Sequence, residues 1–508
     1  MGLNLAVILR ESAKNHGDGI ALIAGESRVT YAQLHATAQR FAGGLWRLGV
    51  RPGQHVALML PNVPHFSIAY FGTHYAAGTV VPLNVMLQPD EIAYHLEDSD
   101  AGAMVVWEDY LERAQAAFGR VPGCKHLIVC KRNPTDPTAP AGAVSMAALL
   151  QGAPPVTELP STMPDDTAVI LYTSGTTGRP KGAELTHFNL LFNAEVVSTR
   201  LMPLDETTVA LTVLPLFHSF GQTVMHNAVL MSGGTVVLLS RFEAAAALQV
   251  MHQHRVTFFS GVPTMYFALL HHPDADAYDL SSLRHCISGG APMPVEVMRA
   301  FDHKHGVNIL EGYGLSETSP VASQNRLDRP KKPGSIGLPL WGVELQLVDE
   351  RGRVIDAPDT PGEIVVKGHN VMKGYYKRPE ATAEAVRDGW LHTGDIATRD
   401  ADGFYYIVDR KKDLILRGGY NVYPREIEEV LYGHPAVAEA AVIGVPDERL
   451  GEEVQAVVAL KPGRRATAEE LIAHCKGQLA AYKCPRNLEL RPELPKGPTG
   501  KILKRALR

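Results

Sequence analysis

At 508 residues the chain is too long for one ordinary hydrophobic core, so we expect two or more domains. Its composition, 45% hydrophobic and 20% charged, is that of a folded globular protein and argues against intrinsic disorder. The formal net charge of −5, with basic residues scattered along the chain, argues against a nucleic-acid partner.

The N-terminal region and the cysteines bear on the compartment. Arg10 and Glu11 interrupt the first apolar run too early for a signal peptide. The most apolar stretch, residues 66–83, contains His74 and several small polar residues, so we expect a buried helix followed by a strand and no membrane span. The five cysteines form no Cys-x-x-Cys pair, which is typical of a reducing compartment. The sequence therefore predicts a cytoplasmic protein.

Up to about residue 340 the chain alternates apolar helical windows with short runs rich in β-formers. Several runs are continuously apolar and bounded by Gly or Pro, for example 55–61, 102–107, 126–131, 234–240 and 257–263. Such runs are typical of parallel strands covered on both faces. Their alternation with helices predicts a layered α/β fold.

One stretch in this region, YTSGTTGRPKGAE at 172–184, suggests a ligand site. Residues 166–172 read as a buried strand, and residues 186–197 read as the start of a helix. Glycines let a backbone approach a ligand, hydroxyl and N–H groups donate hydrogen bonds, and Lys181 adds a mobile positive charge. We therefore expect a phosphate site, although the order lacks the Gly-Lys-Ser/Thr of a Walker A motif. A tight turn without a ligand is the alternative.

Three later positions are further candidates. In EGYGLSETSP (311–320), Tyr313 is a flat ring among glycines, and Glu317 could bind Mg²⁺ on a nucleotide or simply cap a backbone N–H. Asp395 directly follows a glycine, as a ribose-binding carboxylate or an ordinary turn residue would. Lys501 lies in a basic tail that could equally be a solvated helix end.

The last third of the chain changes in character. From residue 341 the strands become shorter and are separated by turn signals, which predicts a small β subdomain. After residue 413, Pro424 marks a helix start and Thr467 with Glu470 forms a capping box. These signals predict a terminal α+β domain of roughly a hundred residues.

The stretches YTSGTTGRPKG, YGLSE, TGD, DRKKDLI with GGYNVYPREIE, and PTGK occur in this order across 172–501. The ordered set covers nearly the whole chain and resembles the adenylate-forming superfamily of acyl-CoA synthetases, luciferases and peptide-synthetase adenylation domains. The resemblance implies an α/β fold with a large N-terminal domain of layered α/β subdomains and a β subdomain, followed by a small mobile α+β domain. It implies an AMP-binding domain over 1–409, a hinge over 410–412 that includes Lys412, and a C-terminal domain over 413–508.

The resemblance also implies the site. Catalysis would involve Lys501, Glu317, Thr318 and His218, and Mg²⁺ would be held by Glu317 and Thr173. The residues expected to bind ATP are Thr173, Ser174, Gly175, Thr176, Thr177, Gly178, Lys181, Gly289, Gly290, Ala291, Glu311, Gly312, Tyr313, Gly314, Thr318, Asp395, Ile407, Arg410 and Lys501. The expected acyl pocket consists of Phe217, His218, Phe220, Val262, Ser288, Gly314 and Val321. The expected CoA contacts are Gly418, Gly419 and Tyr420.

The family's chemistry explains the two domains. A carboxylate first attacks the α-phosphate of ATP to give acyl-AMP and pyrophosphate, and the thiol of CoA then displaces AMP. Lys501 would counter the negative charge of the first transition state. The terminal domain would then rotate about Lys412 and bring Gly418 and Gly419 to the site, although these glycines also fit a plain β-turn.

The nature of the acid is less constrained. His218 stands where peptide-synthetase domains have an aspartate, so an α-amino acid is not expected, and His218 could instead be a core histidine. The apolar surroundings favour a hydrophobic acid of the medium- or long-chain fatty type. Aryl acids such as coumarate or benzoate, and an acyl-AMP ligase that loads a separate carrier protein, are the alternatives. A non-catalytic binder, a P-loop kinase and a metal hydrolase are disfavoured, and a homodimer is left open.

Overall fold

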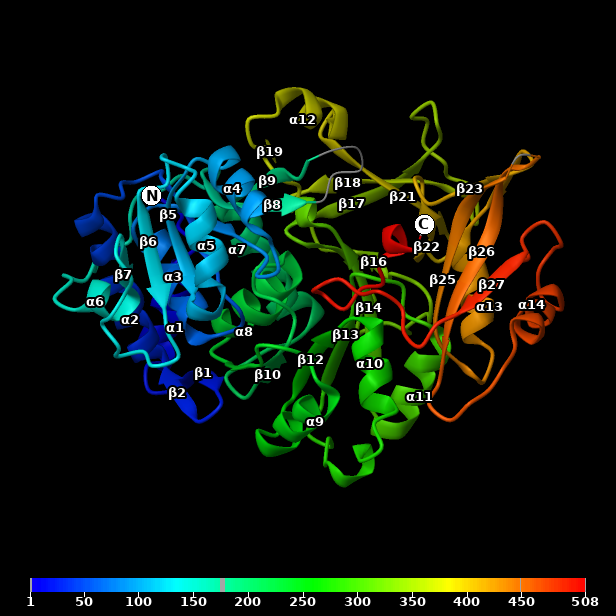
Figure 1. Ribbon diagram of the computed structural model, residues 1–508, viewed down its shortest axis with the longest axis horizontal. Helices are drawn as coiled ribbons and strands as arrows, with labels where there is room; N and C mark the ends of the chain where they lie inside the picture. The colour runs from blue at the N-terminus through cyan, green and yellow to red at the C-terminus, as the bar shows by residue number, and fades with distance from the viewer. Residues whose placement is uncertain (1, 174–178, 448, 508) are drawn as a thin grey trace.

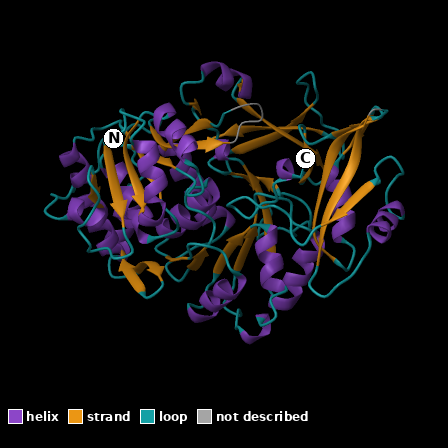
Figure 2. Ribbon diagram, viewed as in Figure 1, coloured by secondary structure: helices purple, strands orange, loops and turns teal. Residues whose placement is uncertain are grey.

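The structure is a computed structural model that describes residues 2–173, 179–447 and 449–507. Figure 1 shows a large N-terminal domain, blue to yellow, and beside it a smaller C-terminal domain in orange and red. Figure 2 shows helices packed around the sheets of the large domain, whereas the C-terminal domain is mostly sheet with helices on one side. The predicted α/β class is confirmed.

The first large sheet has eight strands in the order β19-β9-β8-β4-β3-β5-β6-β7. Its strands are β3 His55–Met59, β4 Thr79–Pro82, β5 Ala101–Trp107, β6 His126–Cys130, β7 Ala143–Ser145, β8 Thr167–Thr173, β9 Lys181–Thr186 and β19 Gly374–Tyr375. Strands β3 to β8 are parallel neighbours, and β9 and β19 add an antiparallel edge.

The second large sheet has nine strands in the order β16-β15-β14-β13-β12-β10-β11-β1-β2. They are β1 Ile20–Ala24, β2 Ser27–Thr30, β10 Val209–Thr212, β11 Thr235–Leu238, β12 Phe258–Gly261, β13 His285–Ser288, β14 Ile309–Gly314, β15 Val321–Gln324 and β16 Leu338–Pro339. The central strands are parallel and apolar on both faces, as continuous hydrophobic runs predict.

Helices cover both sheets and pack with them in two hydrophobic clusters, a large one and a smaller one on the first sheet. They are α1 Val7–His16, α2 Tyr31–Leu48, α3 Pro64–Tyr75, α4 Pro89–Asp98, α5 Leu111–Phe118, α6 Met146–Leu150, α7 His187–Val196, α8 Ala228–Met231, α9 Ala244–Gln253, α10 Pro263–Leu270 and α11 Val295–His305. A π-helix, Phe220–Asn227, precedes α8. The predicted buried helix and strand within residues 66–83 are α3 and β4.

The predicted β subdomain is a five-stranded sheet. Its elements are β17 Val343–Val348, β18 Gly362–Gly368, α12 Pro379–Ala385, β20 Val386–Arg387, β21 Trp390–Arg399 and β22 Tyr405–Arg410. The C-terminal domain has its own five-stranded sheet and core. Its elements are β23 Ile415–Arg417, β24 Tyr420–Val422, α13 Pro424–Tyr432, β25 Val437–Asp447, β26 Gly451–Leu460, α14 Ala468–Lys476 and β27 Asn487–Leu490.

Local signals placed several helix ends well. Pro424 is the first residue of α13, and the side chain of Thr467 accepts a hydrogen bond from the backbone N–H of Glu470 to start α14. The helix start predicted over 186–197 is that of α7, with Thr186 as its N-cap. The residues just before it, Lys181–Thr186, form a strand that the sequence analysis did not predict, β9, which pairs antiparallel with β8. Gly182 permits this pairing, because a Cβ there would lie 2.6 Å from Cγ2 of Ile170.

In the described part of the chain, no helix combines the length and the apolar character needed to cross a bilayer. The five cysteines are buried free thiols.

Candidate active site

A cleft of about 910 Å³ opens where the second sheet, the β subdomain and the end of the chain meet. The carboxyl ends of parallel strands β12 and β13 lead into it, which is where open α/β sheets place their ligands. The predicted residues that line it are Thr173, Lys181, His218, Phe220, Val262, Gly289, Gly290, Gly312, Tyr313, Gly314, Glu317, Val321, Asp395, Arg410, Lys412 and Lys501.

One wall holds a hydrogen-bonded group of three side chains. The hydroxyl of Tyr313 donates to Oδ2 of Asp395 at 2.6 Å, and Nε of Arg410 lies 3.1 Å from Oδ1 of the same carboxylate. Asp395 and Arg410 are cross-strand partners on β21 and β22, so the sheet sets their spacing. Burial, followed by the negative charge of Asp395, raises the pKa of Tyr313, which keeps the phenol protonated as a donor. A flat ring beside a buried carboxylate suits a nucleoside.

A second group lies at the end of the β8–β9 hairpin where β8 finishes and β9 begins. Thr173 and Lys181 are cross-strand partners there. The Lys181 ammonium lies 4.5 Å from the ring centroid of Tyr375, and the Tyr375 hydroxyl donates to Oε1 of Glu317 at 2.9 Å. The ring of Tyr375 contacts the lysine and its hydroxyl contacts the carboxylate. A cation and a carboxylate placed together in this way could bind the phosphates of a nucleotide and their metal ion. The expected ATP residues Ser174, Gly175, Thr176, Thr177 and Gly178 lie outside the described residues.

Lys501 enters the cleft from the C-terminal domain. The hydroxyl of Thr264, at the start of α10, donates to the backbone carbonyl of Gly500 at 2.9 Å. Burial, followed by the positive charge of Arg410, lowers the pKa of Lys501 to about 8. Burial, followed by the charge of Lys501, lowers the pKa of His218 to about 4, and its Nδ1 accepts a 3.3 Å hydrogen bond from the N–H of Phe220. Next to the lysine, His218 is therefore a neutral ring.

Other predicted residues lie off the cleft wall. Thr318 is buried, and its hydroxyl bonds the backbone of its own turn at Leu315 and Pro320. Glu311 is buried and accepts the N–H of Met293 at 3.0 Å, and burial, partly offset by Arg425, raises its pKa to about 7. Four further predicted residues do not line the cleft: Phe217, Ser288, Ala291 and Ile407.

The residues expected to contact CoA are not at the cleft in this domain arrangement. Gly418 and Gly419 form the turn between β23 and β24, both with positive φ, and Tyr420 is 60% exposed against Tyr482. The arrangement therefore presents Lys501 to the cleft and keeps the glycine turn away from it.

The sequence did not point to several residues of the site. Tyr375 and Thr264 carry no local signal, because their roles depend on β19 pairing with β9 and on the C-terminal domain docking on α10. Gln324 also lines the cleft, as the cross-strand partner of Gly312. The pairing of β14 with β15 shifts register between Tyr313 and Gly314. In a regular strand, Val321 and Ser323 would point to the same face. Alternation along the sequence would therefore have predicted Ser323, and not Gln324, as the second cleft residue of β15.

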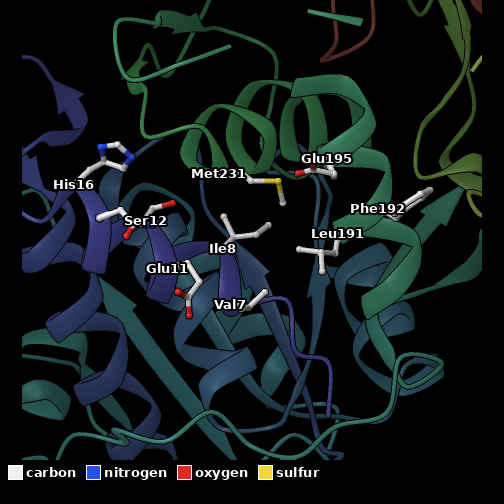
Figure 3. A pocket seen from close by; sticks show the side chains of 10 residues that line it. Val7, Ile8, Glu11, Ser12, His16, Leu191, Phe192, Glu195 and Met231 are labelled. Carbon is white, nitrogen blue, oxygen red and sulfur yellow. The ribbon is translucent and has the colours of Figure 1, made fainter. Parts of the chain in front are cut away.

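A second hollow, of about 280 Å³, lies among α1, α7 and α8. Figure 3 shows Glu11, Glu195 and His16 spread around an apolar floor that includes Ile8 and Met231. These polar groups do not converge on one point, so the hollow lacks the arrangement of a small-molecule site.

Comparisons with known proteins agree with the geometry. The model of the AMP-binding enzyme family matches residues 9–376, and that of the AMP-binding enzyme C-terminal domain matches residues 426–501. A long-chain-fatty-acid–CoA ligase of Bacillus subtilis (strain 168) is 39% identical over 524 positions, covering 99% of this chain and 94% of that protein. A feruloyl-CoA synthase of an Amycolatopsis species is 42% identical over 488 positions, covering 95% of this chain and 94% of that protein.

Solved structures give the same result. The crystal structure of the anthranilate CoA ligase AuaEII in complex with anthranoyl-AMP superposes with a TM-score of 0.93 at 30% identity, covering 100% of this chain and 97% of that one. The match spans both domains and includes the region of the cleft. The chain belongs to the AMP-binding enzyme family, within the acyl-CoA synthetases of the adenylate-forming superfamily.

Proposed function

We propose that this enzyme joins a hydrophobic carboxylic acid to CoA in two steps, with ATP converted to AMP and pyrophosphate. The observation that carries the proposal is the meeting of three groups in one cleft: the Tyr313–Asp395 pair, the Lys181–Tyr375–Glu317 group and Lys501. They supply a nucleoside site, a phosphate site and a buried cation, which is the set that adenylate formation needs.

In the first step, a carboxylate oxygen of the acid attacks the α-phosphorus of ATP, and the bond to the bridging oxygen of pyrophosphate breaks. Tyr313 stacks on the adenine, and Asp395 accepts hydrogen bonds from the ribose hydroxyls. Lys181 holds the departing phosphates. The ammonium of Lys501 lies beside the acid and the α-phosphate, where it offsets the negative charge that crowds the transition state.

The donor set fits a magnesium ion on the nucleotide. Glu317 lines the cleft with one oxygen bonded by Tyr375, and the residues that the structure describes contain no cluster of three or more metal-ligating side chains. Mg²⁺ commonly takes one or two carboxylates and completes its shell with phosphate oxygens and water. Glu317, with Thr173 on the same cleft, would hold the ion, and its charge would make pyrophosphate a better leaving group.

In the second step, the CoA thiolate attacks the acyl carbonyl carbon and AMP leaves with the electrons of the C–O bond. Lys501 then occupies space that the thiol needs, so the C-terminal domain rotates about Lys412. Residues 411–414 between β22 and β23 are the short connection that allows this. The rotation brings Gly418, Gly419 and Tyr420 to the cleft, where the glycines leave room for the pantetheine arm.

The acid end of the cleft consists of Phe220, Val262, Val321 and the backbone of Gly314, with neutral His218 at its border. Most of this lining is apolar, so burial of the acid's hydrocarbon supplies most of its affinity. The relatives named for a long-chain fatty acid and for ferulate support a hydrophobic acid of either kind. With ATP and CoA as co-substrates, we place the reaction in the cytoplasm.

The test is AMP release from Mg-ATP across a panel of acids, with and without CoA. The panel contains acetate, straight-chain fatty acids from short to long, benzoate, coumarate and amino acids. CoA-dependent turnover of a hydrophobic acid is the expected result. Acid-dependent pyrophosphate exchange that CoA does not accelerate would replace CoA by a carrier protein, and the absence of any acid-dependent reaction would overturn the proposal.

A further test separates the two steps. Lys501→Ala should abolish acyl-AMP formation yet leave CoA attack on supplied acyl-AMP largely intact, because only the first step uses the lysine. Equal loss of both half-reactions would contradict the two-conformation mechanism.

A further inference from the structure

Gln324, the last residue of β15, lines the cleft and carries an unpaired hydrogen-bonding group. Its side chain lines the cleft and the residue is only 2% exposed. Its amide nitrogen, Nε2, is buried and has no hydrogen-bond partner within residues 2–173, 179–447 and 449–507. Leaving a buried amide without a hydrogen bond is costly, so a ligand that accepts this hydrogen bond gains a strong advantage.

The strand geometry places Gln324 at the acid end. Successive side chains of a strand point to opposite faces. Tyr313, bonded to Asp395, therefore faces one way from β14, while Gly312 and Gly314 open the other face. The cross-strand partners of these two glycines are Gln324 and Val321, and both line the cleft.

Close contacts extend this wall to Phe220. A Cβ on Gly312 would lie 3.4 Å from Cγ and 3.5 Å from Oε1 of Gln324, so the glutamine lies directly over the Gly312 backbone. A Cβ on Gly289 would lie 3.4 Å from the Gly312 carbonyl oxygen and 3.1 Å from Cε1 of Phe220. One surface therefore runs from Phe220 over Gly289 and Gly312 to Gln324. The side-chain amide of Gln324 is the polar group on this otherwise apolar surface.

A second polar group on the cleft is also unpaired. The hydroxyl oxygen of Ser219 is buried without a hydrogen-bond partner in the described chain, and Ser219 lines the cleft beside Phe220. A pocket for plain hydrocarbon would gain nothing from either group. Both side chains are neutral, so they match a neutral oxygen on the ligand and not a second carboxylate.

We propose that Nε2 of Gln324 donates a hydrogen bond to an oxygen atom on the body of the acid. The enzyme therefore prefers hydrophobic acids that carry a hydroxyl, carbonyl or ether oxygen over hydrocarbon acids of the same length. This inference rests on the proposed ligase activity. A site with a buried donor rejects an analogue that lacks the acceptor far more strongly than an apolar pocket discriminates one methylene.

The test compares acids in pairs that differ by one oxygen: cinnamate with 4-hydroxycinnamate, benzoate with 4-hydroxybenzoate, and decanoate with 10-hydroxydecanoate. The kcat/KM of CoA-dependent AMP release is measured for each acid. For the wild type, we expect at least one oxygenated acid to exceed its hydrocarbon partner about tenfold or more. Gln324→Leu, which keeps the size and removes the amide, should lower that ratio at least about tenfold by slowing the oxygenated acid, with the KM for ATP unchanged.

Two further variants test whether the effect comes from the amide of Gln324 and not from a loss of folding. Gln324→Met gives the same test with an unbranched side chain should the leucine variant fold poorly. The matched control is Gln222→Leu, since Gln222 is also a buried glutamine but its Nε2 already donates to the carbonyl of Leu216 and it does not line the cleft. The control should lose thermal stability and keep the wild-type ratio of the two acids.

The outcomes separate this inference from the ligase proposal. Preference for the hydrocarbon acid in every pair, or an unchanged ratio in both Gln324 variants, would overturn the role of Gln324 while the ligase activity stands. No AMP release with any acid would overturn the ligase proposal and this inference with it.

Discussion

The side-chain hydroxyl of Thr264, in the large domain, donates a 2.9 Å hydrogen bond to the backbone carbonyl of Gly500, in the C-terminal domain. Gly500 has a φ of +81°, and a Cβ there would lie 3.1 Å from Cγ2 of Val262. The next residue is Lys501. The depth of the lysine in the cleft is therefore set by a turn docked at the start of α10. In the proposed two-step mechanism, this contact breaks before CoA attacks.

The Thr264–Gly500 contact predicts a selective effect on one half-reaction. Thr264→Val keeps the shape of the side chain and removes a hydrogen bond worth about 0.5–1.5 kcal/mol, so acyl-AMP formation should slow by about 2- to 10-fold. CoA attack on supplied acyl-AMP should not slow, since that step does not use the contact. Thr264→Ser, which keeps the hydroxyl, is the control, and an equal loss in both half-reactions would contradict the prediction.

The pKa of Lys501 predicts a pH limb on adenylation. Burial, followed by the charge of Arg410, lowers this pKa to about 8, so the free enzyme loses the ammonium as pH rises through about 8. The kcat/KM of acyl-AMP formation should fall about tenfold per pH unit above that value. Lys501→Arg stays charged over the whole range and should react more slowly without the limb. The same limb in the arginine variant would assign it to another group.

The Tyr313–Asp395 pair predicts an effect confined to the nucleotide. Asp395→Ala removes the acceptor proposed for the ribose hydroxyls, and a single hydrogen bond to a charged group is worth about 1.5–3 kcal/mol, so the Kd for ATP should rise at least about tenfold. Tyr313→Phe, which keeps the ring and loses only its hydroxyl bond to Asp395, should weaken ATP binding less. Calorimetric titration measures both. A changed order of preference among acids would count against a ribose role.

Glu311 predicts a pH-dependent cost to stability. Burial, partly offset by Arg425, raises its pKa from 4.5 to about 7. The folded carboxyl therefore keeps its proton where the unfolded one has lost it, and the free energy of unfolding falls as pH rises from about 4.5 to 7. At 1.36 kcal/mol per pKa unit, this amounts to about 3 kcal/mol.

Glu311→Gln removes this titration and keeps an acceptor for the N–H of Met293. Its stability relative to the wild type should rise by up to about 3 kcal/mol between pH 4.5 and pH 8. Urea unfolding of the large domain at several pH values gives the difference in unfolding free energy between the variant and the wild type. Groups that titrate equally in both proteins cancel in this difference. A difference that does not depend on pH would place the pKa of Glu311 near its ordinary value.

The sequence by itself determined the features that depend on neighbouring residues. Continuous apolar runs marked the parallel strands, because a strand covered on both faces needs apolar side chains at every position. Pro424, and the pair Thr467 and Glu470, marked helix starts, because capping acts over three residues. The ordered motifs across 172–501 indicated the family, since such an ordered set is highly specific.

Tertiary structure alone decided how these groups meet. Tyr375 reaches Glu317 and Lys181 only because β19 pairs with β9, a contact between distant parts of the chain. Gln324 lines the cleft together with Val321 only because the β14–β15 pairing shifts register after Tyr313. The placement of Lys501 depends on the docking of two domains through Thr264. Local propensity acts over a few residues, whereas strand pairing and domain docking depend on long-range packing that no local pattern encodes.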